Sequence, residues 1–85
     1  MKLHLRFFAS LREALGPGET IEWTATEAPT AGALRQWLRE RSPAHALALA
    51  PDRAVRVAVD QTMAGDATPL HDGEEVAFFP PVTGG

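Results

Sequence analysis

Residues 76–85 read VAFFPPVTGG, and this stretch decides how the rest of the chain is interpreted. The apolar run 76–79 is typical of a buried strand, and the two prolines after it end any ladder because they lack amide donors. Prolines favour an extended backbone, and glycines lack the Cβ atom that would block a narrow channel. We therefore expect a strand followed by an extended tail suited to insertion, formed by Pro80, Pro81, Val82, Thr83, Gly84 and Gly85.

Residues 2–8 alternate apolar and charged side chains with the period of a half-buried strand. If this strand pairs beside the last one, Phe7 and Phe78 face the core, and the residue that follows each of them faces outward. The segment at position 63 can return to the same face. We predict a hydrophobic docking surface near the base of the tail, formed by Phe8, Met63 and Phe79. The alternative is that loops of the chain itself cover these side chains.

The residues between the two end strands carry strand and helix patterns in turn. The expected elements are a short helix opened by a capping box from Ser10 to Glu13, a strand at 19–25, a main helix at 31–41 capped by Thr30, a short helix at 43–50 capped by Ser42, a strand at 55–60 and a brief return strand at 63–64. This order predicts an α+β domain whose sheet packs on one main helix.

The composition limits the classes of function. The chain has 85 residues, a formal net charge of -3 and no cysteine. This length fits one domain, and the missing thiols exclude disulfides, thiolate metal sites and a catalytic cysteine. A net negative charge disfavours nucleic acid, and no apolar stretch approaches a membrane span or a signal peptide. We expect a cytoplasmic protein that binds neither nucleic acid nor membrane.

The polar side chains do not predict a metal or acid–base site. The histidines fall in different segments, which favours ordinary surface positions for His4, His45 and His71. The acidic residues near Gly73 are typical of a solvated turn, namely Asp72, Glu74 and Glu75. Three arginines follow the main helix and are typical of its solvated face, namely Arg35, Arg39 and Arg41.

Taken together, these residues resemble a known family, the small, sulfur-carrying subunits of molybdopterin synthase. The resemblance covers essentially the whole chain and is strongest in RFFASLRE (6–13), VDQT (59–62) and PLHDGEEVAFFPPVTGG (69–85). Asp60 is a departure, because the family commonly has asparagine there. The resemblance implies a ubiquitin-like β-grasp fold at residues 1–81, with a mixed sheet whose first and last strands are central and parallel. It also implies a flexible Gly-Gly tail at 82–85.

The resemblance also implies a mechanism. A carboxylate is ionised at neutral pH and is a poor electrophile, so it must be activated before it can accept sulfur. In the family, a ubiquitin-activating-like enzyme uses ATP to adenylate the terminal glycine, here Gly85. A sulfur donor such as a cysteine desulfurase system then converts it to a thiocarboxylate. The sulfur is delivered to cyclic pyranopterin monophosphate in the active site of the large synthase subunit, within a heterotetramer.

The same resemblance assigns the remaining roles. The tail residues Pro80 to Thr83 serve as a spacer, Gly84 and Gly85 as the slender tip, and Phe8, Met63 and Phe79 as the surface that docks on the large subunit. The chain itself is expected to be a non-catalytic subunit with no bound cofactor and no metal. Three alternatives remain open: a sulfur carrier of the thiamine type, a ubiquitin-like protein modifier, and an interaction domain whose tail has no chemical role.

Overall fold

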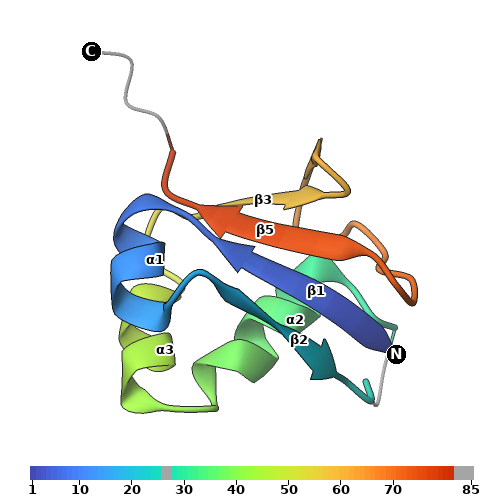
Figure 1. Ribbon diagram of the computed structural model, residues 1–85, viewed down its shortest axis with the longest axis horizontal. Helices are drawn as coiled ribbons and strands as arrows, with labels where there is room; N and C mark the ends of the chain where they lie inside the picture. Colours follow the sequence, from blue (N-terminus) through green and yellow to red (C-terminus); the bar gives the residue numbers. More distant parts are fainter. Residues whose placement is uncertain (26–27, 82–85) are drawn as a thin grey trace.

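In the computed structural model, the described residues are 1–25 and 28–81. They form one five-stranded sheet with three helices, which lie below the sheet and at its left end in the view of Figure 1. The elements in chain order are β1 (Lys2–Phe7), α1 (Ala9–Leu15), β2 (Gly18–Glu22), α2 (Ala31–Arg39), α3 (Pro43–Ala48), β3 (Arg56–Val59), β4 (Thr62–Ala64) and β5 (Glu75–Phe79). None of these helices has the length and apolar character needed to cross a membrane.

The strand order is β2-β1-β5-β3-β4, so the first and last strands lie next to each other at the centre of the sheet. β1 and β5 are parallel, and the other neighbouring pairs are antiparallel. Their register places Phe7 beside Phe78, and the Phe8 N–H donates to the Phe78 carbonyl oxygen at 3.2 Å, continuing the pairing by one residue. The expected mixed β-grasp sheet is confirmed.

The core lies between the sheet and α2. On β1 the predicted alternation is confirmed, because Leu3, Leu5 and Phe7 are almost fully buried while the side chains between them are exposed. The rings of Phe7 and Phe78 stack with their centroids 6.2 Å apart. Burial of each of these large apolar side chains stabilises the fold by about 1.5–3 kcal/mol. From the helix side, the core includes Ala31, Leu34 and Leu38 of α2, together with Leu11 of α1 and Ala48 of α3.

Side-chain caps begin α2 and α3 where the sequence predicts them. The Ala33 N–H donates to the Thr30 hydroxyl oxygen at 3.2 Å, and the His45 N–H donates to that of Ser42 at 3.1 Å. Such caps satisfy backbone donors that have no partner within the helix. Proline at the first position of α3 has no donor to satisfy. Both helices end two residues earlier than expected, at Arg39 and Ala48.

The capping box predicted at Ser10 is wrong, because α1 begins at Ala9, two residues before the helix start that a Ser10 cap implies. Phe8 occupies the N-cap position, and its side chain has no acceptor. Instead, the Phe8 carbonyl oxygen accepts hydrogen bonds from the N–H groups of Leu11 and Arg12. β1 therefore runs directly into the helix, with Ala9 at a φ of +52° absorbing the change of direction.

Arg35 also departs from its prediction as part of a solvated face. Its guanidinium donates to the carbonyl oxygens of Leu49 at 2.9 Å, Ala50 at 2.5 Å and Arg53 at 3.1 Å. These acceptors lie at and just after the carboxyl end of α3, where carbonyl groups lack partners within the helix. Arg35 thus fastens this end of α3 to α2.

His45 is half-buried rather than an ordinary surface histidine. Its Nδ1 lies 2.7 Å from the Ser42 hydroxyl oxygen, and its buried Nε2 has no hydrogen-bond partner among the described residues. Burial, followed by the positive charge of Arg41, lowers the pKa of His45, while the Glu19 carboxylate acts in the opposite direction. The neutral ring therefore belongs to the cap of α3, and we assign it no chemical role.

Gly18, at the start of β2, provides a test of this packing. Its φ is +147°, and a Cβ atom added there would lie 2.1 Å from the Leu5 carbonyl oxygen on the neighbouring strand. We predict that Gly18→Ala lowers the free energy of unfolding by about 2–5 kcal/mol, because strain and a backbone clash add. Denaturant unfolding followed by circular dichroism measures it.

Gly65→Ala is the matched control, since a Cβ atom at that glycine meets no atom within 4 Å. Its unfolding free energy should stay within about 0.5 kcal/mol of the wild type. Equal stability of the Gly18 and Gly65 variants would contradict the close β1–β2 approach.

Candidate functional site

The base of the predicted tail lies where β5 ends. Pro80 lines a groove of about 270 Å³ together with Leu11 of α1 and Arg53. Pro81 lines a second groove, beside Arg56 and Ala64. The chain thus leaves the sheet between α1 and the β3–β4 edge. The rest of the predicted tail, comprising Val82, Thr83, Gly84 and Gly85, lies outside the described residues.

The three predicted docking residues lie on the outer face of the sheet, opposite α2. Phe8 follows buried Phe7 and Phe79 follows buried Phe78, so the pleat turns both outward. Met63 pairs with Ala58, which lies between two buried valines of β3 and therefore shares this outer face. We call Phe8, Met63 and Phe79 the outer patch.

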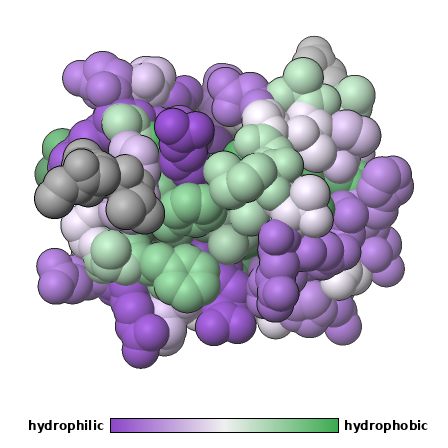
Figure 2. Space-filling model, turned by 90° about the horizontal axis from the view of Figure 1, so that it is seen from above, coloured by the Kyte–Doolittle hydropathy of each residue, from purple (hydrophilic) through white to green (hydrophobic). Residues whose placement is uncertain are grey.

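The outer patch is accessible. Phe8 is 41% exposed and Met63 is 57% exposed, while Phe79 is partly buried. Figure 2 shows apolar side chains gathered in the middle of the face seen from above, surrounded by hydrophilic ones. The alternative was that loops of the chain cover Phe8 and Phe79. The described residues leave Phe8 exposed and cover Phe79 in part.

Two small residues that the sequence analysis did not single out form the floor of this face. Arg6, Ala77, Ala58 and Met63 lie in one cross-strand row, through successive pairings of β1, β5, β3 and β4. The two alanines are only 7% and 8% exposed, since larger neighbours flank them. The row joins Met63 to the aromatic residues through short side chains. The sequence signal for these alanines is the alternation of side chains between the two faces of the sheet along β5 and β3, which puts both alanines on the outer face.

Positive charge borders the outer patch. The Arg6 guanidinium carbon lies 5.6 Å from the centre of the Phe8 ring, and its Nη1 lies 3.4 Å from the Glu75 carboxylate. Arg56 lies opposite Phe79 in the β3–β5 register. A cation over an aromatic face is attracted by the ring and also fixes its orientation. An apolar centre with a charged rim is the usual anatomy of a protein–protein contact.

Asp60, where the resemblance leads us to expect asparagine, stabilises the turn that precedes Met63. Asp60 and Gln61 have φ values of +48° and +67°, as a two-residue hairpin turn requires. Asp60 Oδ1 accepts the Glu75 N–H at 2.8 Å, and the Asp60 N–H donates to the Glu75 carbonyl oxygen at 2.9 Å. Asparagine offers the same side-chain acceptor, so the substitution preserves this contact.

The acidic side chains of the turn before β5 accept hydrogen bonds from backbone N–H groups. The Lys2 N–H donates to Asp72 Oδ1 at 2.6 Å, and the His71 N–H donates to Glu74 Oε1 at 2.5 Å. Within residues 1–25 and 28–81, no group of three or more histidine, cysteine, aspartate or glutamate side chains is placed to hold a metal ion. What the described site offers is a surface for docking beside the base of the tail.

Comparison with known proteins finds one family model and several relatives that match most of this chain. The model of the ThiS family matches residues 5–85. The molybdopterin synthase sulfur carrier subunit of Escherichia coli (strain K12) is 49% identical over 79 residues, covering 93% of this chain and 94% of that protein. Small archaeal modifier protein 3 of Haloferax volcanii is 36% identical, and the alignment covers 100% of both proteins.

One similar chain has been solved in complex with a second subunit. A complex of subunits 1 and 2 of molybdopterin-converting factor from Helicobacter pylori 26695 contains a chain that superposes on this one with a TM-score of 0.64. The two chains are 26% identical, and the alignment covers 100% of both.

Proposed function

The chain belongs to the ThiS family of proteins, and on this premise we propose that it is the sulfur carrier subunit of a molybdopterin synthase. The curated relatives support this role over a thiamine-type carrier, because the Escherichia coli relative is a molybdopterin synthase subunit. The observation that carries the proposal is the position of the outer patch. It lies where β5 leads into the tail, so a partner docked there receives the residues that follow Pro81.

The proposed chemistry takes place at Gly85. An ionised carboxylate resists attack by a sulfur nucleophile, so it is first activated by a ubiquitin-activating-like partner. There a carboxylate oxygen attacks the α-phosphorus of ATP, and pyrophosphate leaves. A persulfide of a desulfurase system then attacks the carbonyl carbon, and AMP leaves. A thiol of that system next attacks the resulting S–S bond, so that a disulfide forms there and the thiocarboxylate of Gly85 is released. The chain itself holds no cofactor in this scheme, since ATP is used by the activating partner.

Delivery of the sulfur requires docking on the large subunit. Phe8, Met63 and Phe79 are buried against that subunit, while Pro80, Pro81, Val82 and Thr83 extend from the patch and Gly84 passes into the active site. The thiocarboxylate of Gly85 then donates its sulfur to cyclic pyranopterin monophosphate. We place this reaction in the cytoplasm, in a heterotetramer with two small subunits, and the catalytic groups belong to the large subunit.

A second function, protein modification, is favoured by the likeness to small archaeal modifier protein 3. The same activated Gly85 carboxyl would then be attacked by a lysine amine of a target protein, leaving an isopeptide bond. Carrier and modifier share the activation step and differ in the nucleophile that follows it. Conjugates of the chain in a cell extract distinguish the two.

Removal of Gly84 and Gly85 tests the proposed function. We predict that the truncated chain loses all molybdopterin formation in a reconstituted reaction, because the carbonyl that accepts sulfur is gone. Its unfolding transition should match that of the full chain, since the core and sheet lie within the described residues. Undiminished molybdopterin formation by the truncated chain would overturn the carrier role.

Charge introduced into the outer patch tests docking. We predict that Phe8→Asp weakens association with the large subunit at least about tenfold, because a carboxylate would have to be desolvated in the contact. Titration calorimetry with the purified large subunit measures this affinity. Phe79→Asp should act in the same direction, while adenylation by the activating enzyme should be less affected.

Leu47→Asp provides the matched control for this experiment. Leu47 is 67% exposed, so it also carries an apolar side chain at the surface, but it lies on α3 rather than on the outer face of the sheet. This variant should bind the large subunit like the wild type. Equal weakening by both substitutions would indicate a general effect of added charge and would refute the outer patch as the contact.

A further inference from the structure

The basic side chains of this protein are almost all arginine. The chain has eight lysine and arginine residues, and lysine occurs only at position 2. The seven arginines cannot act as nucleophiles at neutral pH because the guanidinium group stays protonated. A lysine amine, by contrast, attacks activated acyl groups. The nature of each basic residue therefore matters in a chain whose own carboxyl end becomes activated.

Several of these arginines lie around the base of the tail. Arg56 lies opposite Phe79 in the sheet and lines the same groove as Pro81, and Arg53 lines the same groove as Pro80. Arg6 lies opposite Ala77 and over the Phe8 ring. The cations around the base of the tail are thus arginines.

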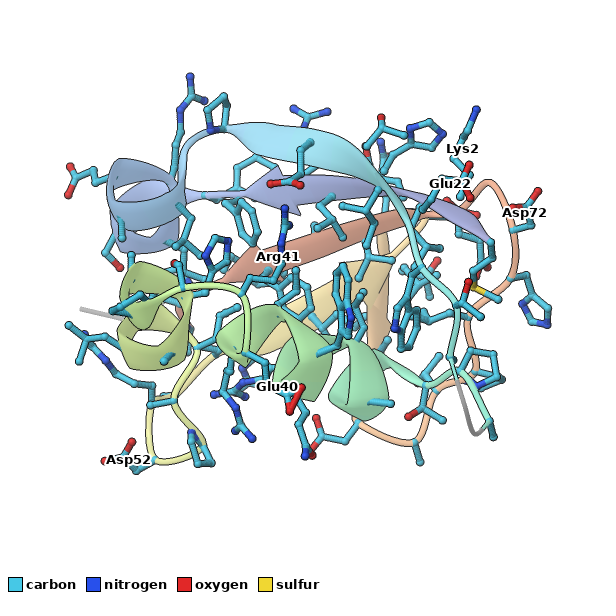
Figure 3. The ribbon with its side chains drawn as sticks, turned by 90° about the horizontal axis from the view of Figure 1, so that it is seen from below. Lys2, Glu22, Glu40, Arg41, Asp52 and Asp72 are labelled. Atoms are coloured by element: carbon cyan, nitrogen blue, oxygen red, sulfur yellow. The ribbon has the colours of Figure 1, made fainter. Side chains whose placement is uncertain are left out.

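Lys2 lies at the opposite end of the sheet, at the start of β1 (Figure 1). Figure 3 shows it together with Glu22 and Asp72 at that end, and Lys2 pairs with Glu22 in the β1–β2 register. The amine of Met1 lies there too and donates to the Trp23 carbonyl oxygen at 2.8 Å. Both amines are therefore far from the point at which the chain leaves β5.

The distance from Lys2 to the base of the tail is about as long as the tail itself. From Lys2 to the level of Phe8 and Phe79, the strand spans about 20 Å at the usual rise per residue. Counted from the same level, the six residues 80–85 extend at most about 21 Å. Gly85 approaches Lys2 only if the tail lies fully extended backward along the sheet. When a linker joins two groups only at full extension, their effective concentration is low.

We propose that arginine in place of lysine around the base of the tail keeps the activated Gly85 carboxyl from acylating its own chain. The proposal rests on the proposed carrier function, since only an activated carboxyl needs such protection. The side reaction avoided is a simple acyl transfer. A lysine nitrogen would attack the Gly85 carbonyl carbon, the new C–N bond would form, the bond to the leaving group would break, and the amine proton would pass to water.

Chemically prepared protein with Gly85 as a small-molecule thioester tests this proposal without any activating enzyme. In Arg56→Lys we expect the thioester to disappear about tenfold or more faster than in the wild type, because the new amine lies within reach of the tail. Intact mass should show an internal amide, lighter than the hydrolysed acid by one water. The wild type should give only the hydrolysed acid.

Glu22→Lys is the matched control, because it adds the same amine beside Lys2 at the far end of the sheet. Its thioester should persist like that of the wild type. Equal lifetimes in the two lysine variants, or an internal amide in the wild type, would overturn the proposal. Loss of carrier activity for another reason would leave these lifetimes unchanged, so the two proposals fail separately.

Discussion

The pairing of the parallel strands β1 and β5 is the constraint on which the rest of the structure depends. Because side chains alternate across a sheet, the register that places Phe7 and Phe78 in the core also places the next residue of each strand outside. A slip of one residue would exchange the two faces and bury the outer patch. Stability and docking are therefore specified by the same backbone hydrogen bonds.

Features that depend on near neighbours in sequence could be predicted. The alternation along β1, the caps at Thr30 and Ser42 and the stop at Pro80 each involve residues a few positions apart, and the structure confirms them. The outward position of Phe8 needed one further assumption, that the first and last strands pair. This pairing is a long-range contact, and the resemblance to a known family supplied it.

Features that depend on distant residues could not be predicted from pattern alone. Arg35 looked like part of a solvated helix face, because its three carbonyl acceptors lie 14 to 18 residues further along the chain. Burial is the largest cause that lowers the pKa of His45, and the opposing carboxylate of Glu19 comes from β2, far away in the sequence. The floor formed by Ala58 and Ala77 likewise depends on the β3–β5 register.

The sheet and the short tail that follows it have separate roles in the proposed function. The described residues provide an apolar surface and a cationic rim, whereas the proposed chemistry needs only the carboxyl group of Gly85. Intact mass of the protein after incubation with ATP, an activating enzyme and a sulfide source tests this central claim most directly. We predict the exchange of one oxygen for sulfur at Gly85. An unchanged mass with several competent activating enzymes would contradict the carrier role.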